Sequence, residues 1–244
     1  MNSYIKQGDC LELMKEIPDK SIDLIICDLP YGVTACNWDK RLPLDKLWLG
    51  YKRIIKPNGA IVLFAKDKFS AEILMSNIKG FKHKWFWDKK QSGSFFLAKY
   101  MPLQIVEEIL VFTKNGERVN YYPQMIKGKM RKRGGAKKVH SSMNKGFRLE
   151  FSSQSDLYYP TNILRYSITK SKRIHPTEKP VELLEYLIKT YSNENEVVLD
   201  NCIGSGSTAV ACIRTNRRYI GFELEKEYYD IAIKRIENEK IKKI

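Results

Sequence analysis

The sequence has few of the residues that bind metals or form disulfides. Its 244 residues include three histidines, which are widely dispersed, and five cysteines, an odd number with no pair in C-x-x-C spacing. These counts argue against a zinc site and a disulfide framework, and they favour reduced thiols in a cytoplasm. Neither a signal peptide nor a run of about 18 apolar residues occurs, so we expect a soluble protein with no membrane partner.

Acidic residues are also scarce relative to basic ones. The 43 lysines and arginines against 28 aspartates and glutamates leave a net charge of +15, which favours a polyanionic partner. Between Arg118 and Leu149 there are ten basic residues and no acidic one. A solvated loop is the ordinary explanation of such a run, and a loop of this kind can still order when it contacts phosphate. The residues that we predict to bind nucleic acid are Lys127, Lys129, Arg131, Lys132, Arg133, Lys137 and Lys138.

A glycine-rich turn near the C-terminus predicts a site for a nucleoside-type cofactor. The strand-like run 196–200 leads into Gly204 and Gly206, a helix is expected at 208–215, and a strand at 218–223 ends in Glu223. In such a unit the glycines let the backbone approach the ligand, and the acid accepts hydrogen bonds from ribose hydroxyls. A solvated strand end is the alternative explanation for the acid. No Gly-Lys-Ser or Gly-Lys-Thr ending occurs, which argues against a phosphate-binding P-loop.

A second signature lies near the N-terminus. The near-continuous apolar run 22–27 predicts a strand covered on both faces of a parallel sheet, with Asp28 at its carboxyl end, where ligands bind in open α/β sheets. Pro30 restricts the backbone, so that a neighbouring carbonyl can point into a cleft, and Tyr31 supplies a flat ring. A carboxylate and a carbonyl can accept both hydrogens of an amino group while the ring stacks on the base that carries it. A strand-ending Asp before an ordinary turn is the commoner alternative.

These segments carry a resemblance to a known family. Asp28-Leu29-Pro30-Tyr31 resembles the Asp-Pro-Pro-Tyr motif of the S-adenosylmethionine-dependent DNA amino-methyltransferases, and residues 200–207 are similar to their cofactor loop. Residues 175–180, His-Pro-Thr-Glu-Lys-Pro, are similar to the His-Pro-Thr-x-Lys-Pro segment of the family's permuted β group. Gly8-Asp9-Cys10 resembles that group's contact with the adenine ring of the cofactor. The resemblance covers residues 8 to about 114 and about 175 to 236.

The resemblance implies S-adenosyl-L-methionine as the cofactor and an exocyclic amine of DNA as the target. The catalytic, target-amine residues that it implies are Asp28, Leu29, Pro30 and Tyr31. The cofactor-binding residues that it implies are Asp9, Cys10, Asp28, His175, Thr177, Lys179, Asp200, Cys202, Gly204, Gly206, Ser207, Thr208 and Glu223. The chain departs from the family pattern at Leu29, where proline is usual, and at Asn201-Cys202, where Pro-Phe is typical.

The resemblance also implies the fold, an α/β, Rossmann-like, mostly parallel doubly wound sheet that is circularly permuted. The target-amine half occupies residues 1–115, a basic target-recognition insertion residues 116–173, and the cofactor-binding half residues 174–244. Because the cofactor half comes last, both ends of the chain should lie on one sheet. Strand-like runs occur at residues 6–9, 22–28, 60–65, 84–87 and 105–112. Helical spacing occurs at 44–54, with a break at 57–59, and at 181–191 and 229–236.

The predicted activity is methyl transfer to the N6 amine of an adenine that is flipped out of double-stranded DNA. Within the resembling family a leading Asp is associated mainly with adenine enzymes and a leading Ser with cytosine-N4 enzymes, so cytosine N4 is the alternative. Methylation at cytosine carbon-5 needs a cysteine nucleophile, and the family's Pro-Cys version of it is absent. From other classes, a dinucleotide-dependent oxidoreductase would explain the glycines and Glu223, and a non-enzymatic nucleic-acid-binding module would explain only the charge.

Other properties are left open by the sequence. The resemblance implies a cytoplasmic protein encoded by a bacterium or a phage, and dimers are common in the resembling group, so a homodimer is one of the states to test. The recognition sequence and a link to a restriction-modification system have no legible signal in the chain.

Overall fold

The computed structural model describes residues 2–32, 40–92, 95–132, 154–168 and 178–243. The chain forms two compact units, one made of residues 1–122 and 162–244 and the other of residues 123–161. The larger unit holds an eight-stranded sheet with all the α-helices that the structure describes, and the smaller one holds a two-stranded hairpin. The residues that line the main cavity all belong to the larger unit.

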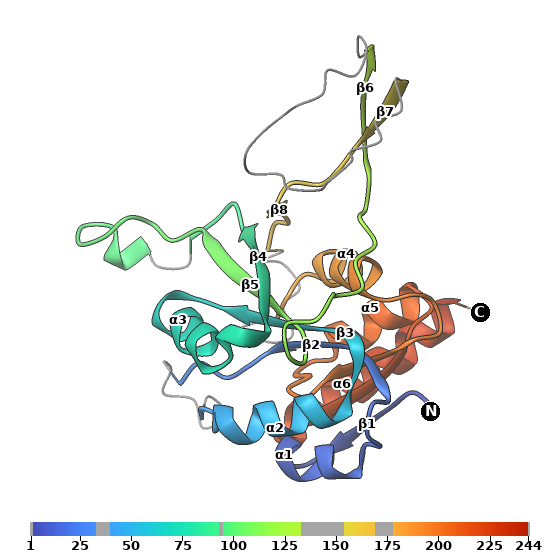
Figure 1. The fold of residues 1–244 in the computed structure, drawn as a ribbon. Helices are drawn as coiled ribbons and strands as arrows, with labels where there is room; N and C mark the ends of the chain where they lie inside the picture. Colours follow the sequence, from blue (N-terminus) through green and yellow to red (C-terminus); the bar gives the residue numbers. More distant parts are fainter. Residues whose placement is uncertain (1, 33–39, 93–94, 133–153, 169–177, 244) are drawn as a thin grey trace. The chain divides into compact units, whose positions relative to one another are not determined.

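The sheet of the larger unit is mostly parallel (Figure 1). In spatial order its strands are β1 (Tyr4–Gln7), β10 (Arg218–Glu223), β9 (Val197–Asp200), β2 (Ile22–Asp28), β3 (Ile55–Ala65), β5 (Val106–Phe112), β4 (Phe81–Asp88) and β8 (Ile163–Arg165). Every neighbouring pair is parallel except those of β5, which runs antiparallel to β3 and to β4. The predicted α/β fold with a mostly parallel sheet is confirmed, and strands from both ends of the chain pair with each other.

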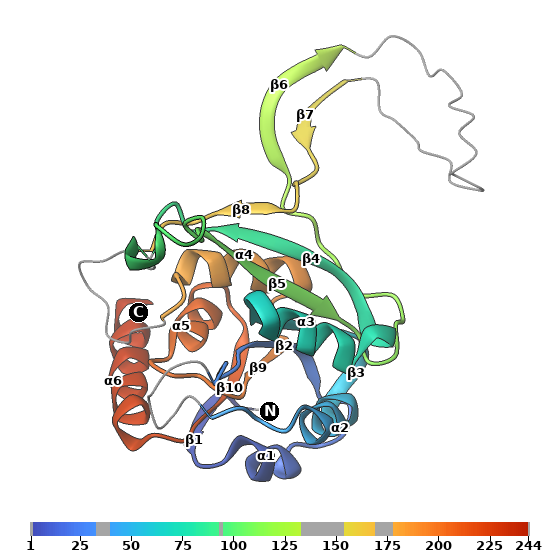
Figure 2. The ribbon, with the colours of Figure 1, turned by 90° about the vertical axis from the view of Figure 1, so that its left-hand side faces the viewer.

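Helices cover both faces of this sheet. One face packs against α1 (Cys10–Leu13), α2 (Leu44–Ile54) and α3 (Asp67–Ser76), and the other against α4 (Val181–Tyr191), α5 (Ser207–Arg214) and α6 (Lys226–Lys243). Single turns of 3-10 helix lie at η1 (Met14–Glu16), η2 (Ile78–Gly80) and η3 (Phe95–Leu97). Figure 2 shows α4 and α5 on the side of the sheet opposite to α1 and α2. No helix in the described ranges is long and apolar enough to cross a membrane.

The coverage on both faces explains the sequence of β2. Leu24 and Ile26 pack into the core that includes α4, α5 and α6, and Ile25 and Cys27 pack into the core that includes α1, α2 and α3. Successive side chains of a strand point to opposite faces, so a strand buried on both faces must be apolar at nearly every position. The polar group at its end, Asp28, therefore marks the point where the strand leaves the core.

Several predicted elements have the predicted bounds. The strands 22–28 and 218–223 and the helices 44–54 and 181–191 agree with β2, β10, α2 and α4. The strand predicted at 6–9 is wrong by two residues, because the Asp9 carboxylate instead caps α1 by accepting the Leu11 N–H at 2.7 Å. The helix ends before residues 57–59, as predicted, but the strand predicted at 60–65 begins earlier, at Ile55, so that β3 follows α2 directly.

The smaller unit pairs β6 (Ile126–Lys132) antiparallel with β7 (Gln154–Tyr158), as Figure 2 shows. The Tyr158 ring lies over Gly128, where a Cβ would come within 2.8 Å of it, and the tyrosine hydroxyl donates to the Lys129 carbonyl at 2.8 Å. Glycine at 128 is required because the ring takes the space of its side chain. Of the residues predicted to bind nucleic acid, β6 carries Lys127, Lys129, Arg131 and Lys132. The others, Arg133, Lys137 and Lys138, lie outside the described residues.

Candidate active site

A cavity of about 800 Å³ opens at the carboxyl ends of the central strands. Its walls include Asp28 at the end of β2, Asp200 at the end of β9 and Glu223 at the end of β10. The chain winds outward in opposite directions from this point, from β9 to β10 on one side and from β2 to β3 on the other. Ligands of open α/β sheets bind at such switch points, and small-molecule sites have volumes of about 300–1,000 Å³. The cavity therefore has the place and the size of a ligand site.

The turn between β9 and α5 forms one wall of the cavity. Asp200 Oδ2 accepts a 2.5 Å hydrogen bond from Thr208 Oγ1, and Asp200 Oδ1 accepts the Cys202 N–H at 3.1 Å. Burial raises the pKa of Asp200 to about 6. These bonds tie the first turn of α5 to the end of β9, so Asp200 shapes the loop that faces the cavity.

The two glycines of this turn have different surroundings. Gly204 has a φ of +53°, lines the cavity, and a Cβ there would meet no atom within 4 Å. Gly206 has a φ of +84°, and a Cβ there would lie 3.1 Å from the Cβ of Ala232 in α6. Gly204 is therefore the position at which a ligand can approach the backbone, whereas Gly206 allows α5 to pack against α6.

Glu223 holds the same turn from the neighbouring strand. Its Oε2 accepts the Gly204 N–H at 2.8 Å, and its Oε1 accepts the Glu225 N–H at 2.9 Å. The side chain lines the cavity, and burial raises its pKa. Because each carboxylate oxygen has a second lone pair, Glu223 can hold the turn and still accept hydrogen bonds from two ribose hydroxyls.

Two thiols form part of the wall beside this turn. Asn201 Nδ2 donates to Cys10 Sγ at 3.6 Å and to Cys202 Sγ at 3.4 Å, while Asn201 Oδ1 accepts from the Tyr51 hydroxyl at 2.5 Å. A hydrogen bond with Cys202 and burial raise the pKa of Cys10, which keeps this thiol neutral. Neutral thiols behave as small apolar groups and suit contact with a flat ring. The described residues contain no group of three or more potential ligands that could hold a metal ion.

Asp28 and Tyr31 form another part of the cavity wall, at the end of β2. Asp28 Oδ1 accepts a 3.1 Å hydrogen bond from the Tyr31 hydroxyl, and the Tyr31 ring packs on Phe69 of α3 with ring centroids 4.9 Å apart. Leu29 is only 2% exposed and packs in the core that includes α1, α2 and α3. Leucine at this position therefore contributes to packing, while Pro30 and Tyr31 line the cavity.

Lys179 reaches the same carboxylate from the segment that precedes α4. Its Nζ lies 2.5 Å from Asp28 Oδ2 and 3.6 Å from Glu107 Oε2, and 5.1 Å from the centre of the Phe64 ring. The Lys179 side chain is 10% exposed. The resemblance implies a cofactor contact for this residue, but the structure places its ammonium group against the carboxylate that the resemblance gives to the target amine.

Two further residues of this site were missed by the sequence analysis. Glu107 of β5 and Lys89, directly after β4, form an ion pair at 2.8 Å, and both line the cavity. Among the described residues, Glu107 Oε2 is a buried atom with no hydrogen-bond partner. A signal was present, because Glu107 interrupts a strand-like run at 105–112 and a charge in such a run is costly unless it is paired.

The charges of this partly buried cluster alternate in sign. Burial raises the pKa of Asp28, and the charge and hydrogen bond of Lys179 oppose that rise. Burial disfavours the charge on Lys179, yet Asp28 and Glu107 together raise its pKa. Burial likewise opposes ionisation of Glu107, but Lys179 and Lys89 lower its pKa. Asp28, Lys179, Glu107 and Lys89 thus form a chain in which each charge has an opposite neighbour.

Most of the predicted cofactor residues come together in this cavity. Those that line it are Asp9, Cys10, Asp28, Lys179, Asp200, Cys202, Gly204, Ser207, Thr208 and Glu223. Gly206 faces α6 instead, and His175 and Thr177 lie outside the described residues. The predicted nucleic-acid-binding residues that are described belong to the smaller unit.

The fold and the site define a Rossmann-like protein with a nucleotide-type cofactor turn beside a partly buried carboxylate. The chain belongs to the N6_N4_Mtase family of DNA methylases, whose model matches residues 22–234. The predicted family of S-adenosylmethionine-dependent DNA amino-methyltransferases is thereby confirmed. Membership in this family also argues against the two alternatives from other classes, the oxidoreductase and the non-enzymatic module. Neither of these hypotheses accounts for both the motif at residues 28–31 and the cofactor loop at residues 200–207.

Individual relatives match over nearly the whole chain. The type II methyltransferase M.HpaI of Haemophilus parainfluenzae is 28% identical over 98% of this chain and 76% of its own length. The DNA adenine methyltransferase YhdJ of Escherichia coli (strain K12) is 26% identical over 96% of this chain and 82% of its own length. The crystal structure of the M1.HpyAVI-SAM complex has a TM-score of 0.63 and 26% identity, covering 95% of this chain and 98% of that one.

Proposed function

We propose that this protein transfers the methyl group of S-adenosyl-L-methionine to the N6 amine of adenine in duplex DNA. The observation that carries the proposal is the position of Asp28 at the switch point of the sheet. The turn and acid of β9 and β10 lie on one side of β2, and Phe64 of β3 and Trp87 of β4, which also line the cavity, lie on the other. A cofactor and a flat base entering from these two sides would meet at the Asp28 carboxylate.

The cavity walls fit the cofactor. Gly204 leaves open space above the turn, Glu223 has lone pairs for ribose hydroxyls, and the neutral thiols of Cys10 and Cys202 offer an apolar surface to an adenine ring. When bound, S-adenosylmethionine supplies an electrophilic methyl group. Asp9, whose carboxylate caps α1 at the edge of the cavity, positions the backbone of Cys10 in this wall.

Asp28 and the Pro30 carbonyl are assigned to the two hydrogens of the target amine. This amine is a poor nucleophile because its lone pair is delocalised into the base. Accepting both hydrogens draws the nitrogen towards tetrahedral geometry and orients its lone pair. The Asp28 oxygens already accept bonds from Tyr31 and Lys179, and each keeps a second lone pair for the amine. After the transfer the nitrogen is acidic, and Asp28 takes its proton.

Tyr31 is assigned to stacking on the flipped base. Its ring is already held by Phe69 and its hydroxyl by Asp28, so little freedom is lost when a base stacks on it. Lys179 is assigned to keeping Asp28 ionised, because an unpaired carboxylate at this depth would favour its protonated form.

The choice of base is tested by expressing the protein in a host without DNA methylation and sequencing the DNA for modified bases. We expect N6-methyladenine in one sequence context, and none in cells that express Asp28→Ala. N4-methylcytosine would favour the alternative reading, since the family includes both kinds of enzyme. Unmodified DNA from cells with soluble wild-type protein would overturn the proposal. The same sequencing data show the recognition sequence, because the modified bases share one sequence context.

The basic hairpin supports DNA as the partner. Lys127 and Lys129 are exposed on β6, and Arg131 and Lys132 continue the strand. Neutralising Arg131, Lys132 and Arg133 together should weaken binding to duplex DNA at all sites and lower the slope of log K against log salt by ~2.7. Titrations between low and moderate salt check this, and an unchanged slope would show that these three side chains do not contact phosphate. We further propose that the protein is a homodimer in the cytoplasm of a bacterium. Analytical ultracentrifugation tests whether it is a dimer.

A further inference from the structure

The loop between β4 and β5 presents large apolar side chains to solvent. Phe95, Phe96 and Tyr100 are 76%, 78% and 85% exposed, and Met101 and Leu103 beside them are also exposed. They lie on η3 and the residues that follow it, in a segment that projects from the ends of β4 and β5 (Figure 1). Exposed apolar clusters of this kind mark contact sites in soluble proteins, because exposing them to water is unfavourable.

The surroundings of these rings are basic. Between Lys89 and Ile105 there are three lysines and no acidic residue. Lys99 is exposed next to Tyr100, whereas Lys89 is paired with Glu107. A basic apolar surface suits a polyanion that also has an apolar interior, and duplex DNA has both. A second copy of this chain suits it less, because two copies that each carry a net charge of +15 repel one another.

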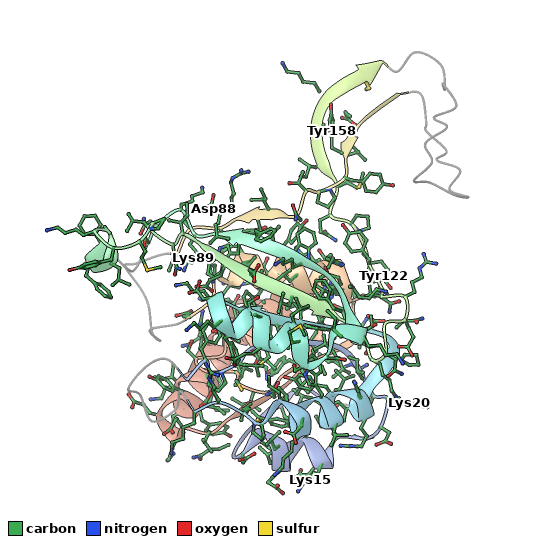
Figure 3. The ribbon with its side chains drawn as sticks, turned by 60° about the vertical axis from the view of Figure 1, so that its left-hand side comes forward. Lys15, Lys20, Asp88, Lys89, Tyr122 and Tyr158 are labelled. Atoms are coloured by element: carbon green, nitrogen blue, oxygen red, sulfur yellow. The ribbon has the colours of Figure 1, made fainter. Side chains whose placement is uncertain are left out.

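The loop starts at the candidate active site. Gln91 and Ser92 line the same cavity as Asp28, and Figure 3 shows Lys89 beside Asp88 at the end of β4, where the loop begins. Phe95 is three residues beyond Ser92, so its Cα lies within about 11 Å of the cavity wall. The loop that carries the aromatic rings therefore begins at the wall of the cavity that is assigned to the flipped base.

Base flipping creates a need for such rings. Extruding a base leaves a gap in the stack and loses the pairing and stacking of that base. Proteins that deform duplexes insert apolar side chains, phenylalanine among them, between base steps. A ring that fills the gap replaces part of the lost stacking and slows the return of the base.

We propose that residues 95–103 enter the duplex at the target site and that Phe95 and Phe96 fill the space left by the flipped base. The inference rests on the proposed function, since only a base that leaves the stack creates this space. It assigns a second DNA-contacting surface, in the larger unit, whose role is to hold the target base in the cavity rather than to read sequence or neutralise phosphate.

The test compares Phe95→Ala/Phe96→Ala with the wild type on two duplexes that carry the methylated sequence found by sequencing. One duplex has the normal partner base opposite the target, and the other has an abasic position there, which lowers the cost of extrusion. The matched control is Leu49→Ala/Met75→Ala, which removes two apolar side chains that are 71% exposed on α2 and α3. A third duplex carries 2-aminopurine as the target and reports unstacking by fluorescence.

We expect the double phenylalanine variant to lose roughly 10- to 100-fold in kcat/KM on the paired duplex and to come within about threefold of the wild type on the abasic one. Its 2-aminopurine signal should fall, while the control variant matches the wild type in every assay. Phe95→Leu/Phe96→Leu should recover most of the loss, because an aliphatic wedge still fills the gap.

Other outcomes overturn the inference. An equal loss on both duplexes would show that the rings act on the cofactor site or on the fold. No loss in activity, together with a lower sedimentation coefficient, would show that the rings hold a second copy of the chain. A wild-type protein that methylates neither duplex would overturn the proposed function itself. An active wild type together with a phenylalanine variant of equal activity on the paired duplex would overturn only the role given to the two rings.

Discussion

Lys179 Nζ lies 2.5 Å from Asp28 Oδ2, although the two residues are 151 positions apart in the sequence. The ion pair joins the segment before α4 to the end of β2, and it continues through Glu107 to Lys89. A partly buried carboxylate that lacks a cation favours the protonated form, which accepts hydrogen bonds more weakly than the carboxylate does. The pair thus connects the packing of the two sequence halves to the chemistry assigned to Asp28.

Lys179→Met should make the enzyme more sensitive to acid. Among the described residues, the charged and polar groups that act on Asp28 include Lys179 before α4, Glu107 of β5 and Tyr31, with Lys89 paired to the far side of Glu107. Removing the Lys179 cation lets burial raise the pKa of Asp28 further, so the acidic limb of kcat/KM should move to higher pH. Activity at neutral pH should fall about a hundredfold. Methyl transfer measured from pH 5 to 9 checks both.

Lys56→Met is the matched control for this variant. Lys56 pairs with Asp23 at 2.5 Å, at the opposite end of the strand that carries Asp28. Its loss should leave the pH profile unchanged. An unshifted acidic limb in Lys179→Met, with normal folding, would assign the limb to a group other than Asp28.

Glu107→Gln should shift the pH profile in the opposite direction. The negative charge of Glu107 raises the pKa of Asp28, so its removal lowers that pKa and moves the acidic limb of kcat/KM to lower pH. The amide keeps the shape of the side chain. A purely structural role would lower the melting temperature without moving the limb, so the two measurements together separate electrostatics from packing. A shift to higher pH would contradict the charge order described for the site.

Tyr31→Ala and Tyr31→Phe should differ in severity. Alanine removes both the ring and the hydrogen bond to Asp28, and we expect a loss of about a hundredfold or more in kcat/KM. Phenylalanine keeps the ring and its contact with Phe69, and loses one hydrogen bond to a charged group, for an expected loss of about tenfold. Steady-state kinetics on one duplex substrate checks the order. If the two variants are equally impaired, stacking is not the function of the ring.

Gly204→Ala and Gly206→Ala should fail in different ways. A methyl group at 204 enters the open space of the cavity, so the dissociation constant for S-adenosylmethionine should rise at least tenfold, while the left-handed backbone costs only about 1 kcal/mol of stability. A methyl group at 206 strains the backbone and presses on Ala232, so the free energy of unfolding should fall by about 1–3 kcal/mol, with cofactor affinity changed less. Calorimetric titration and denaturant unfolding measure the two effects. Normal affinity in Gly204→Ala would place the cofactor elsewhere.

The local patterns of the sequence determined much of this protein. The apolar run before Asp28 predicted β2 to the residue, because a strand covered on both faces must be apolar throughout. The glycine turn and the acid at the end of the next strand likewise predicted the wall formed by Gly204 and Glu223. These features depend on residues that are adjacent in the sequence, so the sequence alone is enough to predict them.

Only the tertiary structure decided which charged residues pair with one another and which glycine faces the cavity. Glu107 meets Lys179 because β5 lies antiparallel between β3 and β4, a pairing that no short segment specifies. Gly204 and Gly206 have equivalent signals in the sequence, yet α6 packs against one and leaves the other open to the cavity. Such contacts join residues far apart in the chain, and their energies depend on the order of strands and on burial, which exist only once the whole sheet has formed.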